Sequence, residues 1–554
     1  MKKTKHFLPL AMAAVMTLSA PSIAFAEGPG GTPPGFGNSS SVTYKGAATI
    51  TSSQTTSGET YSSTAADENA LLIDTSNAVT ITNPTVTKSG DSDGGDNCNF
   101  YGINSAIMAK GGGTTTITGG TVTASAKGAN GIFSYGGNGG NNGASGDGTT
   151  VNISDTKITT TGDNGGGIMT TGGGVTVAKN LTVTTSGQSS APIRTDRGGG
   201  TVTVTGGTYT SNGQGSPSIY STADITVNSA SLTSNKSEGV CIEGQNSITL
   251  NDCTLTANNN ALNGNAQFYD TIMIYQSQSG DAADGISSFT MSGGTLNSKK
   301  GDVFHVTNTT AVINLKNVKI NNTDDDNVLL SVCDDGWNGA SNAATLNATS
   351  QTLSGALLVG SDSTLNLNLT NSSTFTGQTS GSITNDKSSS VSSSIGTVNV
   401  TIDSGSTWKL TGNSTISSIS GSGSIDYNGY TLTVGSTKYT SGSIGTVSAS
   451  TSNSSGTTVS STATKKVTFK NVKKIIKYKK IKKKAISYSV IKKSDGGKVT
   501  YKVTKGKKKY IKVSKKGKVT VKKGAKKGTY KVKITVAKKG NYKKSTKTIK
   551  IVIK

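Results

Sequence analysis

One short pattern recurs along most of the chain, between residues 79 and 417. Two apolar residues separated by one polar residue are followed by four mostly polar residues and a further apolar residue. Successive copies are 23 or more residues apart, which indicates a short unit with insertions. Such a period predicts a stack of repeated units and argues against a globular enzyme domain. The second apolar residue of each pair forms a series of twelve anchors: Ile81, Ile117, Ile153, Val177, Val204, Val227, Leu250, Met291, Leu315, Leu346, Leu369 and Ile402.

Each anchor segment alternates apolar residues with Thr or Asn, as in Val202-Thr203-Val204, which is typical of a strand with one buried face. A second apolar run follows about half a repeat later, for example around Ile193 and Ile242. Gly- and Asn-rich stretches separate these runs and supply the turns. We therefore predict an all-β chain: a right-handed parallel β-helix, a solenoid of about 12 coils, followed by a small antiparallel β-sandwich.

The ends of the chain differ from the repeat. Residues 1–26 have the lysines, apolar stretch and Ala-Phe-Ala ending of a signal peptide. Residues 27–40 are expected to be a flexible leader, residues 41–440 the β-helix, and residues 441–464 a Ser/Thr/Gly-rich linker. No later segment is long and apolar enough for a membrane span. We expect a secreted protein that is retained at the bacterial cell surface.

Residues 465–554 hold 36 lysines and one acid, Asp495, for a net charge of +35. Runs such as Tyr530-Lys-Val-Lys-Ile-Thr-Val536 alternate apolar residues with Lys or Thr, so we expect a Lys-coated sandwich. A charge of this size favours polyanions through counterion release. We expect an anionic cell-wall polymer as the partner of residues 465–554, with no dedicated nucleic-acid binding.

The segment from Gly528 to Val536, followed by Gly-Asn-Tyr542, resembles the end of bacterial immunoglobulin-like domains. The repeat, with its Gly-Gly-Thr turns and the Arg194-Thr-Asp-Arg-Gly-Gly-Gly200 segment, resembles exported adhesin-like β-helix proteins of Gram-positive bacteria. That group includes carbohydrate-binding members, surface adhesins and some polysaccharide lyases. The resemblance implies a β-helix that binds a polysaccharide or a host surface.

If the isoleucine of the second apolar run points inward, the next residue of each coil lies on the outside of the β-helix. Aromatic faces beside arginines and carboxylates are typical of a sugar-binding groove. The alternative is a mixed surface whose aromatic residues cover the sheet. The outward column is Met108, Phe133, Met169, Arg194, Tyr220, Glu243, Tyr275 and His305, and the predicted ligand-binding residues are Arg194, Asp196, Arg197, Tyr220, Glu243, Tyr275 and His305.

Arg194 and Arg197 are the only arginines of the chain. Their planar guanidinium groups suit a carboxylate, including that of a uronic acid. A local ion pair with Asp196 is the alternative. A second column, the Thr or Asn of each anchor segment, is expected to be a solvated face with cross-strand Thr pairing.

The competing function is that of a polysaccharide lyase or glycoside hydrolase acting on acidic glycans. It would gather acids and Arg194 in one cleft formed by the insertions 88–113 and 258–285, whereas a binding protein would show a continuous ladder. No catalytic residue is predicted. No metal-ligand spacing is present, so we expect no cofactor, with Ca²⁺ the one cation that the acidic clusters leave open. Candidate acids are Asp196, Asp270, Asp281, Asp284, Asp302, Asp334 and Asp335, and the four cysteines, whose pairing stays open, are Cys98, Cys241, Cys253 and Cys333.

Overall fold

The computed structural model describes residues 42–92, 94–138, 146–264, 266–277, 279–336, 342–445, 473–490, 499–514, 517–536 and 545–554. The predicted signal peptide and leader, and residues 446–464 of the predicted linker, lie outside this range. The chain divides into two compact units, with the boundary between Ser454 and Ser455. Each unit is considered by itself.

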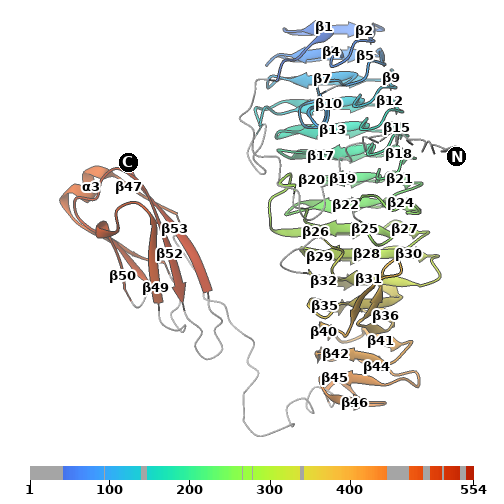
Figure 1. Cartoon of the computed structure of the whole chain (residues 1–554), viewed down its shortest axis with the longest axis vertical. Helices are drawn as coiled ribbons and strands as arrows, with labels where there is room; N and C mark the ends of the chain where they lie inside the picture. The colour runs from blue at the N-terminus through green and yellow to red at the C-terminus, as the bar shows by residue number, and fades with distance from the viewer. Residues whose placement is uncertain are drawn as a thin grey trace, which may run out of the picture. The chain divides into compact units, whose positions relative to one another are not determined.

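The first unit is the predicted right-handed parallel β-helix, in which three strands per coil form three long parallel sheets (Figure 1). Sheet A contains β1 (Gly46–Ile50), β4 (Asn69–Asp74), β7 (Ile107–Lys110), β10 (Ile132–Tyr135), β13 (Ile168–Thr171), β16 (Ile193–Thr195), β19 (Ile219–Ser221), β22 (Val240–Glu243), β25 (Asp270–Tyr275), β28 (Asp302–Thr307), β31 (Val328–Val332), β34 (Ala356–Val359) and β37 (Thr379–Ser380). Sheet B contains β2 (Gln54–Ser57), β5 (Val79–Thr82), β8 (Thr114–Thr118), β11 (Thr150–Ser154), β14 (Gly174–Lys179), β17 (Gly200–Thr205), β20 (Asp224–Asn228), β23 (Ser247–Asn251), β26 (Ile286–Ser292), β29 (Thr310–Lys316), β32 (Asn342–Thr349), β35 (Ser363–Thr370), β40 (Thr397–Ile402) and β43 (Ser418–Gly421).

The third side of the helix is split between two sheets. Sheet C contains β3 (Thr60–Ser63), β6 (Thr85–Lys88), β9 (Thr121–Ala124), β12 (Lys157–Thr160), β15 (Thr182–Thr185), β18 (Thr208–Ser211), β21 (Ser231–Ser234), β24 (Thr254–Ala257), β27 (Thr295–Ser298) and β30 (Lys319–Asn322). A four-stranded sheet follows in the later coils, with β33 (Thr352–Ser354), β36 (Thr374–Gly377), β41 (Thr407–Leu410) and β44 (Ser424–Asp426). Smaller elements are α1 (Asn97–Tyr101), the β38 (Ser382–Thr384) and β39 (Ser390–Ser393) hairpin, β42 (Ser414–Ile416), β45 (Leu432–Val434) and β46 (Thr437–Tyr439).

The twelve predicted anchors fall on twelve consecutive strands of the 14-stranded sheet B, from β5 to β40. The sheet continues by one strand at each end, so the predicted number of about 12 coils is slightly too low. One anchor is wrong by one residue: Val177 is 41% exposed, because Thr176 and Ala178 are the inward residues of β14. Their register partners are Val202 and Val204. Both faces of this segment carry small residues, which left the alternation ambiguous.

The corner between sheets B and C needs a left-handed backbone conformation. Glycine adopts this conformation freely, and among L-residues Asn and Asp tolerate it best. The repeat supplies one suitable residue in nearly every coil. The φ angle is 49° at Asn83, 68° at Gly119 and 53° at Asp155, for example. Equivalent residues of later coils are Asn180, Gly206, Ser229, Asp252, Gly293, Asn317, Ser350 and Asn371. The Gly- and Asn-rich composition is therefore the turn chemistry of the coil, although composition alone suggests disorder.

Inward side chains from the three sheets form one continuous apolar core. It consists of stacked Val, Ile and Leu with a few aromatic pairs, such as Phe375 and Trp408, whose ring centroids are 5.7 Å apart. Each inward residue contacts its equivalents in the coils above and below, so a few apolar residues per coil are sufficient. This explains how a chain with only 32% hydrophobic residues is folded.

The second unit is a small two-sheet structure, as predicted, and nearly all of its strand pairs are antiparallel. One sheet has the order β47-β53-β52-β49 and the other β48-β51-β50, and among the described strands only β47 and β53 pair in parallel. The two sheets enclose a separate apolar core that includes Ile481, Val519 and Ile551. Its elements are β47 (Lys473–Ile476), α3 (Tyr478–Lys483), β48 (Ile486–Ser489), β49 (Val499–Lys505), the 3-10 helix η1 (Lys508–Tyr510), β50 (Ile511–Val513), β51 (Lys518–Val521), β52 (Gly528–Val536) and β53 (Ser545–Ile553).

Candidate functional site

The predicted column on sheet A points away from the main core, as expected, but the prediction that it is exposed is wrong. No member of the column is more than 5% exposed, and Phe133, Met169 and His305 are fully buried. The apolar column residues join two clusters separate from the main core, one around Met108 and Phe133 and one around Tyr220 and Tyr275. The exposed alternative, a mixed surface, is therefore wrong as well.

The insertions of the repeat cover this face. Helix α1 and its flanking residues lie over the early coils, where the Thr171 hydroxyl donates to the Phe100 carbonyl at 2.7 Å. Described residues of the insertion 258–285 on either side of β25 lie over the middle coils: Phe268 stacks on His305 with ring centroids 4.5 Å apart, and Asp281 pairs with Arg197. Coil-to-coil periodicity describes only the regular strands, so it contains no information on where insertions fold.

Arg194 and Asp196 form a buried ion pair. The Nη2 of Arg194 donates to Asp196 Oδ2 at 2.8 Å, and its Nη1 donates to the Ser189 carbonyl at 2.8 Å. Burial raises the pKa of Asp196 to about 7, against the opposing effect of Arg194. The local pair that we considered as an alternative is thus present.

Arg197 joins the two insertions to the β-helix. Its Nε and Nη2 donate to Asp281 Oδ1 at 2.9 and 2.6 Å, and its guanidinium lies over the Phe100 ring, 4.0 Å from the centroid. Asp281 belongs to the insertion 258–285 and Phe100 to α1. One half-buried arginine therefore holds both covering segments, a role that the sequence did not indicate.

Glu243 is the centre of a second buried network. Tyr220 and Tyr275 donate hydroxyl hydrogen bonds to its Oε2 at 2.6 and 3.2 Å. Its Oε1 accepts from the hydroxyls of Ser277 and Ser279. Burial raises the pKa of Glu243, and these hydrogen bonds oppose the rise. Three predicted site residues are thus brought together, but in the interior.

His305 lies in a third buried group. Its Nδ1 is 2.6 Å from Ser331 Oγ, the Ser331 hydroxyl donates to Asp302, and its Nε2 is 3.7 Å from Asp335 Oδ2. Burial lowers the pKa of His305 to about 3 and raises that of Asp302 to about 8. Ser, His and Asp meet here, as nucleophilic catalysis requires, but His305 and Ser331 are 0% exposed. Ser331 was not predicted as a site residue, because it carries no local motif.

The other candidate acids divide between the interior and the surface. Asp270 and Asp335 are buried, whereas Asp284 and Asp334 are exposed. Within the described ranges, no three His, Cys, Asp or Glu side chains are grouped as metal ligands. All four cysteines are buried and unpaired in the structure. No described helix has the length and hydropathy needed to cross a membrane.

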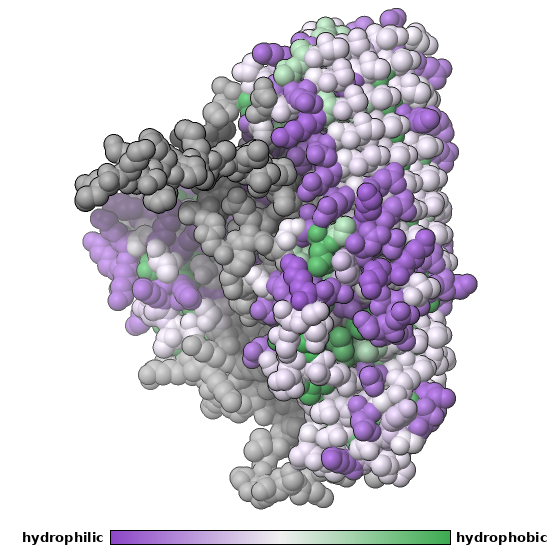
Figure 2. Space-filling view, turned by 45° about the vertical axis from the view of Figure 1, so that its right-hand side comes forward, coloured by the Kyte–Doolittle hydropathy of each residue, from purple (hydrophilic) through white to green (hydrophobic). Residues whose placement is uncertain are grey.

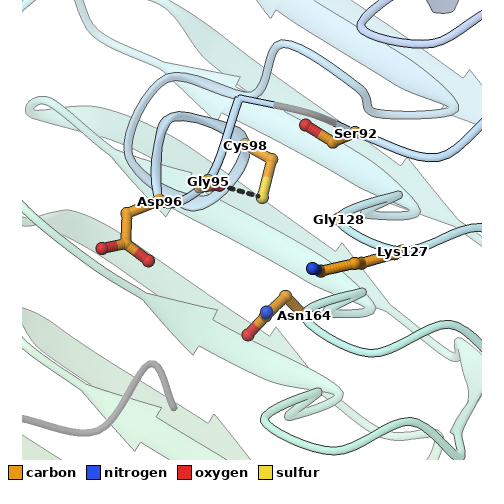
Figure 3. Close-up of a pocket in the computed structure, with 7 residues that line it drawn as sticks. All are labelled: Ser92, Gly95, Asp96, Cys98, Lys127, Gly128 and Asn164. Carbon is orange, nitrogen blue, oxygen red and sulfur yellow. Dashed lines mark hydrogen bonds between the residues drawn. The ribbon is translucent and has the colours of Figure 1, made fainter. Parts of the chain in front are cut away.

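A small open pocket lies beside α1 (Figure 3). Figure 3 shows Asp96 and Cys98 from the α1 segment on one side, with Lys127 and Asn164 from successive coils facing them. The Cys98 thiol donates to the Gly95 carbonyl at 3.0 Å. Burial raises the pKa of this thiol to about 12, while Arg194 is near enough to oppose the rise.

No insertion among the described residues is seen to cover sheets B and C, which present polar side chains in register. On sheet C the outward residues Thr159, Thr184 and Thr210 align from coil to coil. On sheet B, Asn368 donates to Asn347 at 2.8 Å, and Asn347 donates to Asn314 at 2.9 Å. Figure 2 shows a face dominated by side chains of intermediate hydropathy, with hydrophilic ones between them. These are the solvated faces expected from the Thr and Asn columns, except that Thr176 is buried.

The second unit carries lysines on the outer faces of its strands. Along β52, Tyr530, Val532 and Ile534 are buried, and Lys531 and Lys533 are exposed. Lys533 lies directly opposite Lys502 of β49, and Lys531 directly opposite Lys550 of β53. Like charges in directly opposed positions destabilise a sheet.

No protein-family model, curated protein or solved structure matches the chain.

Proposed function

We propose that the chain is an exported, adhesin-like protein of the bacterial cell surface. Its basic domain binds an anionic cell-wall polymer, and its β-helix presents long polar faces to a polysaccharide or a host surface. The basic domain is, in this proposal, a bacterial immunoglobulin-like module. Its role is attachment, whereas the β-helix supplies the contact surface.

The observation that carries the proposal is the opposed lysines of the basic domain. Lys502, Lys531, Lys533 and Lys550 are all exposed, and they form two directly opposed pairs on three adjacent strands. Their mutual repulsion is a cost to folding that a bound polyanion removes. A polymer that contacts several lysines also releases its counterions, which gives a favourable and salt-dependent free energy.

The surface of the β-helix supports the second half of the proposal. Outward hydroxyl and amide groups repeat at the strand spacing of about 4.8 Å along sheets B and C. A polysaccharide offers hydroxyl groups at regular intervals, so a register of donors and acceptors suits it. The buried residues of sheet A do not enter this argument.

The first test is binding of the full-length protein to wall teichoic acid, an acidic glycan and DNA at increasing salt. We expect binding to teichoic acid that weakens steeply with salt, and a loss of affinity in a Lys502→Glu, Lys531→Glu double variant. A Lys45→Glu, Lys236→Glu double variant is the matched control, because both lysines are exposed and lie in the β-helix unit outside the strands of sheets B and C, and it should have little effect. Salt-independent binding, or equal losses in both variants, would contradict the proposal, and a preference for DNA would replace the cell-wall partner.

The same preparation tests the β-helix with neutral and acidic polysaccharides. Binding without new reducing or unsaturated ends supports adhesion. Release of such ends would replace adhesion with the lyase or hydrolase function that the acidic residues first suggested.

A further inference from the structure

Three buried acids stack in register where consecutive strands of sheet A begin. Asp270 of β25 and Asp302 of β28 are directly opposite each other. The register pairs Val240 of β22 with Ile272, so Glu238 occupies the same position one coil earlier. Glu238, Asp270 and Asp302 are only 5%, 1% and 8% exposed. These three residues, which we call the acid column, are thus enclosed in the protein.

The acid column lacks a compensating positive charge. None of its three members forms an ion pair with a described residue. Asp270 Oδ1 is buried and has no hydrogen-bond partner in the described part of the chain. Parallel strands are about 4.8 Å apart, so neighbouring carboxyls repel each other once they are ionised, and burial keeps water from screening them. The column therefore favours its protonated form.

The elements around the column add mainly further acids. Lys300 is paired with Asp324 at 3.2 Å, and His305 is neutral because burial lowers its pKa to about 3. Burial and neighbouring acids raise the pKa of Asp302 to about 8 and that of Asp270 well above its ordinary value. The titratable and charged groups that surround the column are Cys241, Lys300, His305, Asp324, Asp326, Cys333, Asp334, Asp335 and Asp386.

The acid column is joined to the segment that covers His305. Residues 267–269 lead directly into Asp270, and the Asp302 backbone N–H donates to the Tyr269 carbonyl at 2.9 Å. Phe268, in the middle of this segment, stacks on His305. Any separation of the column residues therefore acts directly on residues 267–269.

Two loops of later coils hold the other side of residues 267–269. The Gln267 backbone N–H donates to Asp335 Oδ1 at 2.9 Å, and the Tyr269 N–H donates to Asp386 Oδ2 at 2.7 Å. Asp386 lies in the turn between β38 and β39, and its own N–H donates to the Gln267 carbonyl at 2.9 Å. Because these contacts are few and involve one short segment, the segment can detach while the strands of the core stay folded.

We propose that the acid column is a pH-sensitive switch that holds residues 267–269 on sheet A. While the column is protonated, the segment stays docked. Loss of the protons places like charges in the interior, and release of the segment lets water reach them. Release also uncovers His305 and the apolar group of Phe268, Cys333 and Ile383. This inference concerns the β-helix alone and does not depend on polyanion binding by the basic domain.

The direction of the pH effect follows from proton linkage. The docked acids keep their protons to a higher pH than released acids, whose ordinary pKa is about 4. The docked state is therefore favoured at acidic pH and is weakened as the pH rises toward 8. Each proton that is lost on release changes the opening equilibrium by about tenfold per pH unit.

Hydrogen exchange of the full-length protein between pH 6 and pH 8, followed by mass spectrometry and corrected for the intrinsic exchange rate, tests the proposal. We expect the protection of residues 267–269 to fall at least about tenfold over this range. Strand β23 of sheet B should stay protected throughout, because its exchange requires unfolding of the coils. A pH-independent protection of residues 267–269 would overturn the switch, and so would loss of protection in β23 at the same time.

Variants of the column give a second test. The double variant Asp270→Asn, Asp302→Asn removes two titrating groups with little change in shape, so the pH dependence should largely disappear. Asp302→Asn alone should reduce it, and this variant decides the matter if the double variant does not fold. Asp196→Asn is the matched control, because Asp196 is a buried acid of sheet A outside the column, 3% exposed. An unchanged pH dependence in folded Asp302→Asn, or its loss in Asp196→Asn, would overturn the proposal.

Discussion

Sheets A and B carry outward columns of similar length, yet one is buried and the other is solvated. On sheet A the column residues Tyr220 and Glu243 are at most 5% exposed, whereas Thr226 and Thr249 of sheet B are only half-buried. The two columns differ in composition: sheet A has Met, aromatic and charged residues, and sheet B has Thr and Asn. A solenoid repeat thus determines whether a side chain points inward or outward, but an outward side chain is exposed only where no insertion covers it.

The largest effect is expected at the inward, buried positions of the strands that carry these outward columns. Leu250 of sheet B is 0% exposed and packs in the continuous core. Leu250→Ala should destabilise the β-helix by about 2–5 kcal/mol, because it removes apolar contacts and leaves a cavity between coils. Urea unfolding followed by circular dichroism measures the change. A loss well below this range would show that neighbouring coils collapse into the space.

The next effect separates the covered column from a solvated one. Glu243→Ala should cost about 1–3 kcal/mol, because it leaves the buried hydroxyls of Tyr220, Tyr275 and Ser277 without their acceptor. Glu243→Gln keeps an acceptor oxygen and should cost less. The same unfolding experiment applies, and equal stability of the wild type and the Ala variant would mean that the network is open to water.

A pH dependence should sharpen the comparison, since the covered face contains buried acids. Burial raises the pKa of Asp196 to about 7 and that of Asp302 to about 8, so the folded state retains protons that the unfolded state has lost above its pKa of about 4. Stability therefore falls as pH rises from 6.5 to 9, by on the order of 1 kcal/mol. His305, with its pKa lowered to about 3, acts in the opposite direction only at lower pH.

Thermal unfolding at several pH values checks this prediction, with Asp302→Asn as the control. The variant should show a smaller decrease between pH 6.5 and 9, because one of the titrating groups is gone. A decrease of the same size in the variant would assign the pH dependence to other groups.

The smallest effect is expected on the uncovered column. Thr249 is half-buried and points outward from β23, between Thr226 and Thr290 of the neighbouring coils. Thr249→Ala should change stability by less than about 0.5 kcal/mol, as is usual at the surface. Comparison with Leu250→Ala, one residue away, measures the difference between the two faces of a single strand. A cost near that of Leu250→Ala would mean that the Thr column is part of a cooperative structure.

Much of the fold could be predicted because alternation and corner residues are local properties. The anchors located twelve strands of sheet B, and residues such as Asn83 and Gly119 mark the corners that require a left-handed backbone. The third strand of each coil was not anticipated separately, and the alternation failed at Val177, where both faces carry small residues. The strands of the basic domain could be predicted from the same alternation, with lysine as the polar residue.

The candidate site could be predicted only in part. The column residues were identified correctly as outward residues, and Arg194 was paired with Asp196 as the local alternative required. Contacts such as Arg197 with Asp281, 84 residues apart, have no signature in a repeat. Apolar outward residues such as Met108 and Phe133 were the one available signal, since an outward row that is apolar needs a cover.

By itself, the sequence determined the β-helix, the direction of most side chains and the charge of the C-terminal domain, because these depend on period, turn residues and composition. Only the tertiary structure decided which face of the helix is covered, because that depends on where the insertions pack. The burial of Arg194, Glu243 and His305, and the ion pair between Arg197 and Asp281, follow from this packing. The same side chains therefore form an interior network in the folded protein, although the repeat alone predicted a surface groove.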